Sequence, residues 1–324
     1  MNQVTIGIDI GGTNSVVGVV NSEGKVLVRD SISTPQHGDA GIFVQDLKKT
    51  VNKLIAELEP ETEVLGIGLG APNGNYYNGT IEDAPNLSFE GIVPLVEMLK
   101  AEFPEMKAIA LTNDANAATL GEMIYGGAQG MKNFVMYTLG TGVGSGVVAN
   151  GDLIYGKDGF AGECGHVVVI PDGRMCGCGI PGHLEAYCSA PGMKRTAFEL
   201  LAHYNDTDSP LATKSFQDLT SKDIYEAAVA GDAIANEVFE VTGGYLGSAM
   251  ASTVHTLSPE AIFLFGGPTA AGDLILKPTQ KALDHYLLPI FKGTVPIIVS
   301  KLSLGDAAIV GASSLVMNEL TKAE

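Results

Sequence analysis

The chain has 324 residues, enough for two domains that bury a sizeable core. Its 45% hydrophobic and 17% charged residues are typical of a folded α/β protein and exclude a disordered chain. The 37 acidic and 19 basic residues give a formal net charge of −18, which would repel a nucleic-acid backbone. No apolar run approaches the about 20 residues that span a bilayer, and no export signal is visible. We expect a cytoplasmic protein with no nucleic acid and no membrane as partners.

The first third of the chain predicts strands that end in polar residues. Strands are expected over 4–10, 16–20 and 25–28, with a glycine-rich turn after the first. Apolar residues at helical spacing predict a helix over 40–58. Two more strands, over 64–69 and 109–111, deliver polar residues at their carboxyl ends, where α/β sheets bind ligands.

The second half of the chain begins like the first. A strand over 134–139, a glycine turn and a strand over 146–149 repeat the opening pattern, which indicates a duplicated module. A third glycine turn follows an expected strand over 261–265, and helices are expected over 227–256 and 307–320. We place the domain boundary near Ala115, which gives a small α/β domain at 1–114 and a large α/β domain at 115–305.

Two glycine turns are candidate phosphate sites. In Asp9-Ile10-Gly11-Gly12-Thr13-Asn14, backbone N–H groups can approach phosphate oxygens, and Asp9 could hold Mg²⁺ through water. The second turn is Gly140-Thr141-Gly142-Val143-Gly144. An ordinary hairpin would explain either turn alone, whereas two turns in duplicated modules favour a nucleotide bound between the domains. Neither turn fits a Walker A loop or the dinucleotide fingerprint.

A candidate catalytic acid lies in Asn113-Asp114-Ala115-Asn116, between the strand over 109–111 and an expected helix over 115–123. The Asp114 carboxylate could accept a proton from a substrate hydroxyl. It could also cap the helix, because helix starts favour Asp and Asn. A cap does not exclude catalysis.

All four cysteines fall within residues 164–188, which favours metal ligation or a local redox pair over disulfides. His166, Cys176, Cys178 and His183 would supply two imidazoles and two thiolates, a set suited to a structural Zn²⁺. The alternative is a pair of glycine-rich turns with unliganded, buried thiols. Glu163 and Glu185 flank the cluster.

In combination and order, these motifs resemble the ROK family of sugar kinases, most closely its bacterial glucokinases. The resemblance runs from Asp9-Ile10-Gly11-Gly12-Thr13 to Leu304-Gly305-Asp306-Ala307-Ala308. It implies an α/β, two-domain actin/hexokinase-like (ribonuclease H-like) fold with a nucleotide and sugar cleft between the domains. The C-terminal helix, 306–324, would pack back on the small domain. In one departure, His183 stands where the family usually has a third Cys, so the geometry of the metal loop must adjust.

The resemblance also implies ATP-dependent phosphorylation of a hexose at its 6-hydroxyl, with glucose the expected hexose. N-acetylglucosamine, N-acetylmannosamine and fructose are the alternatives. Asp114 would be the general base. Sugar contacts are expected from Asn113, Glu163, His166, Glu185, Asn86 and Gly74. Nucleotide contacts are expected from Asp9, Gly11, Gly12, Thr13, Thr141, Gly142, Gly266 and Gly267. ATP, Mg²⁺ and structural Zn²⁺ would take part, and His166 would bind zinc through one ring nitrogen and sugar through the other.

Two other classes of function are open. ROK transcription regulators share these motifs but carry an N-terminal helix-turn-helix, and here Asp9 already lies within the first strand, which leaves no room for one. A sugar-binding protein without catalysis is the other class, and the presence of Asp114 argues against it. We therefore expect an ATP:hexose 6-phosphotransferase, assembled as a homodimer or homotetramer like other members of the family.

Overall fold

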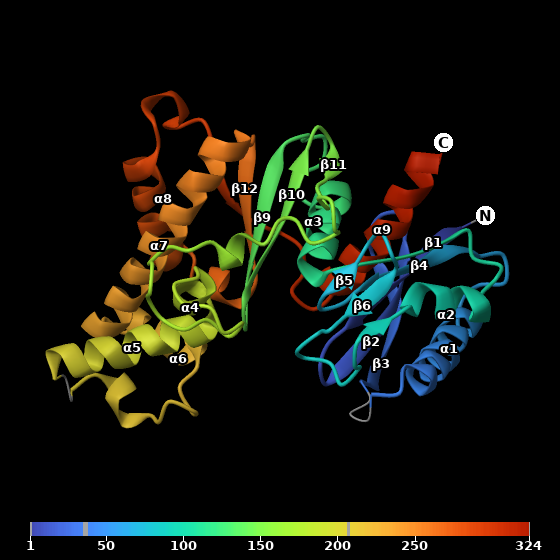
Figure 1. The fold of residues 1–324 in the computed structure, drawn as a ribbon, viewed down its shortest axis with the longest axis horizontal. Helices are drawn as coiled ribbons and strands as arrows, with labels where there is room; N and C mark the ends of the chain where they lie inside the picture. The colour runs from blue at the N-terminus through green and yellow to red at the C-terminus, as the bar shows by residue number, and fades with distance from the viewer. Residues whose placement is uncertain (1, 35–37, 206–207, 324) are drawn as a thin grey trace. The chain divides into compact units, whose positions relative to one another are not determined.

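The computed structural model describes residues 2–34, 38–205 and 208–323, which divide into two compact units (Figure 1). Unit 1 takes residues up to Met131, a short segment over Asp152–Gly162, and the C-terminal part from Lys301; unit 2 takes the rest. Unit 1 extends past the expected boundary at residue 114 because α3 (Asp114–Tyr125) packs against α9 (Ala307–Ala323).

The main sheet of unit 1 has the strand order β3-β2-β1-β4-β8. Its strands are β1 (Gln3–Ile10), β2 (Asn14–Asn21), β3 (Val26–Ser33), β4 (Glu63–Gly70) and β8 (Ala108–Thr112). The first three form an antiparallel meander, whereas β4 and β8 run parallel to β1. The residues that follow β1, β4 and β8 therefore gather at one edge of the sheet. A small sheet follows β4 and consists of β5 (Gly74–Asn75), β6 (Thr80–Glu82) and β7 (Ile92–Val93).

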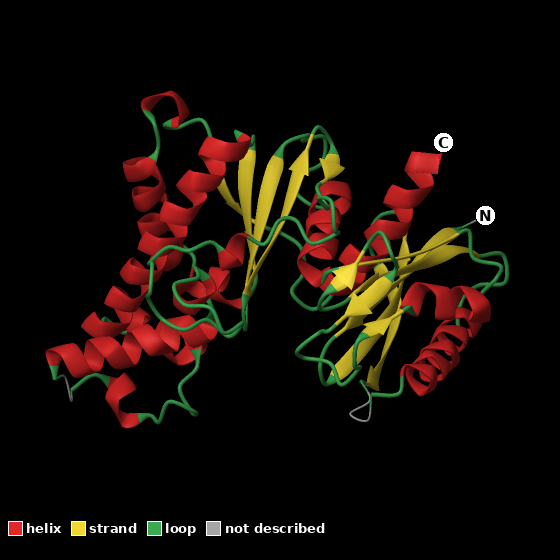
Figure 2. Ribbon diagram, in the orientation of Figure 1, coloured by secondary structure: helices red, strands yellow, loops and turns green. Residues whose placement is uncertain are grey.

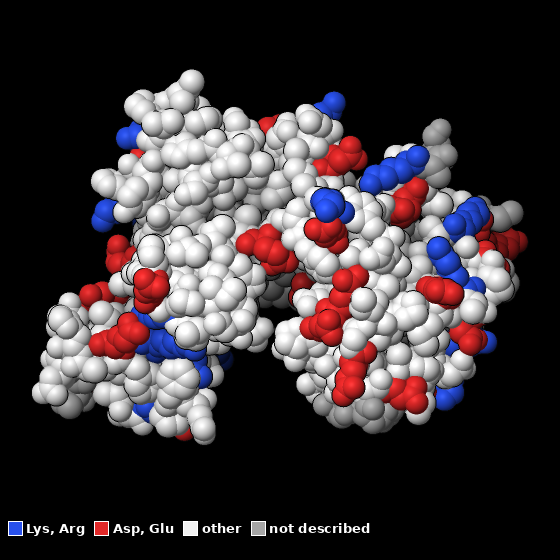
Figure 3. Space-filling view, viewed as in Figure 1, with Lys and Arg blue, Asp and Glu red and all other residues white. Residues whose placement is uncertain are grey.

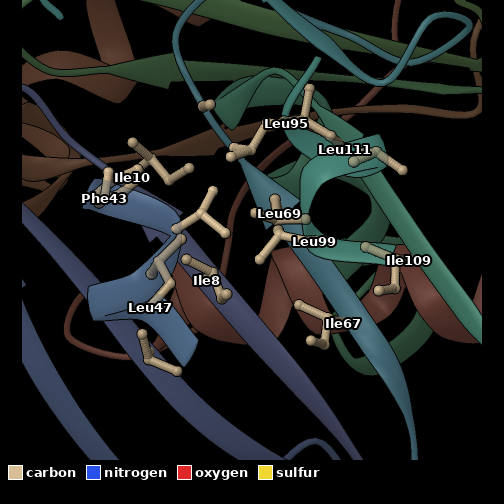
Figure 4. Packing of buried hydrophobic residues seen from close by; sticks show 14 of the residues in the cluster. Ile8, Ile10, Phe43, Leu47, Ile67, Leu69, Leu95, Leu99, Ile109 and Leu111 are labelled. Carbon is tan, nitrogen blue, oxygen red and sulfur yellow. The ribbon is translucent and has the colours of Figure 1, made fainter. Parts of the chain in front are cut away.

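The core of unit 1 lies between the main sheet and two helices, α1 (Ala40–Ala56) and α2 (Leu95–Glu102). Phe43 and Leu47 of α1 belong to one buried cluster with Ile8, Ile10 and Leu69 of the strands (Figure 4). Complete burial of each such side chain contributes about 1.5–3 kcal/mol. Side chains alternate along a strand, so Asp9, next to Ile8, faces the opposite side of the sheet.

That opposite side is covered by α3 and α9. The α9 backbone lies so close to β4 that a Cβ on Gly68 would stand 1.8 Å from the Ala312 carbonyl oxygen. Thr5 of β1 and Ser313 of α9 share a buried hydrogen bond of 2.7 Å between their hydroxyls. The small residues of β1 and β4 therefore let the C-terminal helix dock directly on the sheet.

Unit 2 is built on a sheet of order β11-β10-β9-β12-β13, with long helices beside it (Figure 2). The strands are β9 (Phe134–Leu139), β10 (Val143–Ala149), β11 (Asp152–Leu153), β12 (Ala261–Phe265) and β13 (Ile297–Val299). The helices are α4 (Glu185–Cys188), α5 (Ala190–Tyr204), α6 (Ser221–Val229), α7 (Ala233–Leu257) and α8 (Asp273–Tyr286). The Tyr137 hydroxyl of β9 bonds the Thr253 hydroxyl of α7 at 2.7 Å, which ties that helix to the sheet.

The expected strands are confirmed, but the single helix predicted over 227–256 was wrong. The chain breaks into α6 and α7 at Ala230-Gly231-Asp232. Gly231 adopts φ +93°, and the Asp232 carboxylate accepts the Ala235 N–H at 2.7 Å, which caps α7. The prediction failed because the apolar residues keep their helical spacing across this break.

Charged side chains are scattered over the face shown in Figure 3, where acidic groups are widespread and no continuous basic surface appears. Within the described part of the chain, no helix is long and apolar enough to cross a membrane.

Candidate active site

The end of β8 leads directly into α3 and presents Asn113 and Asp114. The Asn113 Oδ1 accepts the Asn116 N–H at 2.7 Å, so Asn113 is the N-cap and Asp114 is the first helical residue. The alternative in which Asp114 caps the helix was therefore wrong. Asp114 accepts a hydrogen bond from the Ala115 N–H at 2.9 Å, and its side chain is exposed. An exposed carboxylate at this position is open to a ligand.

Asp9 lies at the end of β1, on the side of the sheet that α3 covers. Burial raises the pKa of the Asp9 carboxyl to about 6, and repulsion from the Asp114 charge adds to the rise. Crowding by surrounding protein also raises the pKa of Asp114, against the lowering effect of the Ala115 N–H, although solvent still reaches the carboxyl. Two neighbouring carboxylates with raised pKa values suit a proton acceptor and a cation ligand.

The first glycine turn follows Asp9 and is held by backbone contacts. The Gly11 N–H donates to the Asn14 carbonyl at 3.1 Å, and the Thr34 hydroxyl donates to the Gly11 carbonyl at 2.6 Å. A Cβ on Gly12 would stand 2.4 Å from the Asn86 carbonyl oxygen, so the structure brings Asn86 against this turn. Thr13 is exposed at its tip.

Gly74, a predicted sugar contact, is buried against the end of β8. A Cβ there would stand 2.4 Å from the Thr112 carbonyl oxygen. The same carbonyl accepts the Ala71 N–H at 3.0 Å. The position of Gly74 therefore supports the strand that delivers Asn113.

In unit 2, the second glycine turn joins β9 to β10 and is held by a charged side chain. The Gly140 N–H donates to the Gly142 carbonyl at 2.9 Å, and the Val143 N–H donates to Glu185 Oε2 at 3.1 Å. Thr141 is exposed at the tip. Glu185, the first residue of α4, thus fixes the turn from outside it.

The third turn, Gly266-Gly267, follows β12. Gly266 has φ +112°, and a Cβ on it would stand 2.0 Å from the Leu139 carbonyl oxygen, so only glycine fits there. A pocket of about 370 Å³ adjoins the turn, and its lining includes Met193, Tyr225, Phe239 and Gly267. Tyr225 and Phe239 could not be predicted as site residues, because neither belongs to a motif and only the fold brings α6 and α7 together.

The four predicted metal ligands come together in unit 2. One ligand atom from each of His166, Cys176, Cys178 and His183 lies within 4.8 Å of all the others. His166 Nδ1 stands 3.2 Å from His183 Nδ1 and 3.9 Å from Cys176 Sγ, and Cys178 Sγ stands 3.2 Å from His183 Nδ1. A tetrahedral Zn²⁺ separates its nitrogen and sulfur ligands by roughly 3.3–3.8 Å. The donor set and its spacing therefore fit a zinc-type metal.

The metal cluster touches the second glycine turn through one side chain. The Cys176 thiol donates to Glu185 Oε1 at 3.1 Å, while Oε2 of the same carboxylate accepts the Val143 N–H. Glu163 immediately precedes the 3-10 helix η1 (Cys164–His166), which carries His166. The other two cysteines lie outside the cluster, and the buried Cys188 thiol donates to the Thr242 carbonyl.

Arg174 fastens the loop over 166–183, which carries the candidate metal ligands, to α5. Its guanidinium donates to both carboxylate oxygens of Glu199 and to the Thr196 hydroxyl, and it stacks 4.7 Å from the centre of the Tyr187 ring. Two-pronged pairing of this kind fixes the orientation of a side chain. The loop is therefore held by the Arg174 contacts to α5 and Tyr187 as well as by the contacts among the four candidate metal ligands. Arg174 belongs to no predicted motif, because its partners on α5 are more than 20 residues away along the chain.

Comparison with known proteins accords with these features. The chain is 35% identical to a glucokinase of Halalkalibacterium halodurans, covering 97% of this chain and 95% of the relative. It is 34% identical to a glucokinase of Thermotoga maritima, covering 97% and 98%. The structure of a ROK family glucokinase from Streptomyces griseus in complex with glucose and AMPPNP is 30% identical, with a TM-score of 0.78 over 97% of this chain and 99% of that one.

These similarities confirm the predicted α/β fold class of the sugar kinases. The sequence model of the ROK family matches residues 5–319. The chain therefore belongs to the ROK family.

Proposed function

We propose that this protein is a glucokinase, which transfers the γ-phosphoryl group of ATP to the 6-hydroxyl of glucose. The observation that carries the proposal is Asp114, exposed at the start of α3 and next to a second carboxylate, Asp9, and its glycine turn. The glucokinases from H. halodurans and T. maritima, and the S. griseus structure with glucose and AMPPNP, support the choice of substrates.

Asp114 would take the proton of the 6-hydroxyl as the oxygen attacks phosphorus. A carboxyl with a raised pKa is a stronger base than an ordinary aspartate, which suits it to this transfer near neutral pH. Positioning and charge stabilisation supply most of the catalysis in phosphoryl transfer. Gly11 and Gly12 would let the backbone of the turn lie against the phosphates, and the Thr13 hydroxyl would donate to a phosphate oxygen.

Asp9 is the residue that would hold Mg²⁺, through water. Its carboxylate is a hard oxygen donor, and the repulsion from Asp114 favours a cation beside it. When bound, Mg²⁺ offsets the charge on the phosphates, which the net charge of −18 otherwise opposes.

Unit 2 would supply further contacts to both substrates. The apolar pocket beside Gly267 suits the base of a nucleotide, and Thr141 and Gly142 suit its phosphates. His166 directs Nδ1 into the metal cluster, so its Nε2 would meet a sugar hydroxyl. Glu185 Oε2 accepts the Val143 N–H and has capacity for a second bond, from sugar. Oε1, which accepts the Cys176 thiol proton, would become available to sugar when Cys176 binds zinc as a thiolate.

Structural Zn²⁺ would bind His166, Cys176, Cys178 and His183 and hold the metal-bearing loop in shape. Asn113, Asn86 and Glu163 complete the proposed sugar contacts. The Asn113 amide uses its Oδ1 in the cap, which leaves its Nδ2 to donate to sugar. We also expect a homodimer or homotetramer, which light scattering would detect.

A coupled ADP-release assay tests the proposal, with glucose, N-acetylglucosamine, N-acetylmannosamine, mannose and fructose compared at equal concentration. We expect kcat/KM for glucose to exceed the others by at least about tenfold, a ratio within the reach of a few polar contacts. A higher value for either N-acetyl sugar would reassign the protein as a hexosamine kinase. No ADP with any of these sugars would contradict the kinase proposal.

A further inference from the structure

Residues 152–162 belong to unit 1, although the chain on both sides of them belongs to unit 2. We call this segment the strap. It opens with β11 (Asp152–Leu153) and ends at Gly162, one residue before Glu163. Apart from Gly162, none of its residues belongs to a motif with an assigned chemical role. Within unit 1 it nevertheless makes a ring stack and several side-chain hydrogen bonds.

An aromatic stack anchors the strap. The Tyr155 ring lies flat on the Tyr76 ring, with centroids 3.9 Å apart and an interplanar angle of 4°, and the Tyr77 ring meets it edge-on at 6.0 Å. Tyr155 is only 5% exposed. Tyr76 is itself fixed, because its hydroxyl donates to Glu319 of α9 at 2.6 Å. Burial and stacking together favour one position for the Tyr155 ring.

Two side chains of the loop around β5 hold the strap backbone. Asn75 Nδ2 donates to the Asp158 carbonyl at 3.0 Å, and the Tyr77 hydroxyl donates to the Gly156 carbonyl at 2.7 Å. Within the strap, the Ala161 N–H donates to the Tyr155 carbonyl at 3.0 Å. These bonds close a compact loop whose exit leads into Glu163.

The anchor also lies against the strand that delivers the proposed base. The hydroxyls of Tyr155 and Thr112 are both buried, and neither reaches hydrogen-bond geometry with another described residue. Thr112 is nevertheless near enough to lower the pKa of Tyr155, against the larger rise caused by burial. Thr112 ends β8 and stands two residues before Asp114.

We propose that Tyr155 is a positioning residue for the sugar: stacked on Tyr76, it holds the strap to the unit that carries Asp114 and so fixes where the chain enters Glu163 and His166. The inference rests on the proposed function, in which Glu163 and His166 bind sugar hydroxyls. Release of the strap then weakens sugar binding specifically, because nucleotide groups lie on other segments.

The test compares Tyr155→Ala, Tyr76→Ala, the double variant and Tyr155→Phe, with exposed Tyr204→Ala as a matched control. Tyr155→Ala should raise the KM for glucose about tenfold and leave the KM for ATP within about twofold. Tyr76→Ala should do the same, and the double variant should add little, because both substitutions remove one stack. Tyr155→Phe keeps the stack and should restore the KM for glucose. Hydrogen exchange should quicken over 152–162 in Tyr155→Ala, Tyr76→Ala and the double variant, and stay unchanged in Tyr155→Phe and Tyr204→Ala.

Unchanged exchange over the strap in Tyr155→Ala would refute the anchor. Faster exchange with an unchanged KM for glucose would refute the positioning role while the kinase proposal stands. A loss in Tyr155→Phe equal to that in Tyr155→Ala would assign the effect to the hydroxyl and overturn the stacking claim. Failure of the wild-type protein to phosphorylate any sugar is a separate result, which refutes the proposed function itself.

Discussion

The two glycine turns after β1 and β9 look alike in the sequence but are held in different ways. The first is fixed by uncharged groups: the Gly11 N–H donates to the Asn14 carbonyl, the Thr34 hydroxyl donates to the Gly11 carbonyl, and the Asn86 carbonyl packs against Gly12. The second is fixed by Glu185, whose carboxylate also accepts the Cys176 thiol proton. One turn therefore needs no charged side chain, and the other depends on a charged residue 42 positions along the chain.

This difference separates the roles of the two units. In unit 1, the turn lies beside two carboxylates, Asp9 and Asp114, which we propose serve the reaction. In unit 2, the polar groups around the turn form a connected network that runs from backbone to carboxylate to thiol. Damage to the metal cluster should spread to the second turn and leave the first intact, which the following substitutions examine.

The largest effect is expected from Asp114→Asn. Loss of the base should lower kcat by about 10³-fold or more, while the dissociation constant for glucose changes by less than about threefold. Steady-state kinetics and titration calorimetry measure the two. Asp39→Asn is the matched control, because Asn also caps a helix and Asp39 serves α1 as its N-cap. Activity near normal in Asp114→Asn would eliminate this residue as the base.

Glu185→Ala should lower kcat/KM for ATP by roughly 10–100-fold, because a misplaced phosphate turn costs orientation. Glu185→Gln keeps an acceptor for the Val143 N–H and should recover part of the loss. Thr34→Val is the counterpart in unit 1, since it removes the hydroxyl that bonds the Gly11 carbonyl and the Ser15 hydroxyl, and it should change kcat/KM by less than about threefold. Equal losses in Glu185→Ala and Thr34→Val would contradict the contrast between the turns.

Removal of the proposed zinc should act on unit 2 alone. Cys178→Ser should abolish bound zinc, raise the KM for glucose about tenfold and lower Tm by roughly 5–10 °C. Cys164→Ser, outside the cluster, should keep the metal. Elemental analysis, kinetics and hydrogen exchange measure these effects. Faster hydrogen exchange in the first glycine turn as well as in the second would show that the metal cluster also affects unit 1, and would contradict this prediction.

The smallest effect is the pH dependence. In the proposed reaction Asp9 and Asp114 work as ionised carboxylates, and both have raised pKa values, that of Asp9 to about 6. Activity should therefore fall as pH drops through about 6. The free energy of unfolding should change in the opposite sense. Asp9 ionises near pH 3.8 in the unfolded chain and near pH 6 in the folded chain, so its contribution to the stability of the fold declines as pH rises from about 3.8 to about 6. An acidic limb of kcat/KM near the ordinary aspartate value of 3.8 would contradict this.

Local patterns predicted much of the fold and the site. Short motifs of neighbouring residues predicted the segments that follow β1, β8, β9 and β12. Motifs of the same kind predicted the four candidate metal ligands. Their chemistry is visible wherever the fold places them. The helix break at Asp232 was missed because the apolar spacing of α6 continues smoothly into α7, so that only the cap reveals it.

Contacts made across long stretches of chain could not be predicted. Arg174 on Glu199, Glu185 on Val143 and Tyr155 on Tyr76 each join segments without a shared pattern. A tyrosine in a loop carries no periodicity to mark its partner. The residues that position a site are therefore harder to predict than those that perform its chemistry.

The most direct test of the central claim is ³¹P NMR of a mixture of ATP, Mg²⁺ and glucose, with wild-type protein and with Asp114→Asn. We predict that wild type forms the 6-phosphate ester of glucose as sole sugar product and that the variant forms almost none in the same time. A phosphate ester at another hydroxyl, or equal formation of the 6-phosphate by both proteins, would contradict the claim.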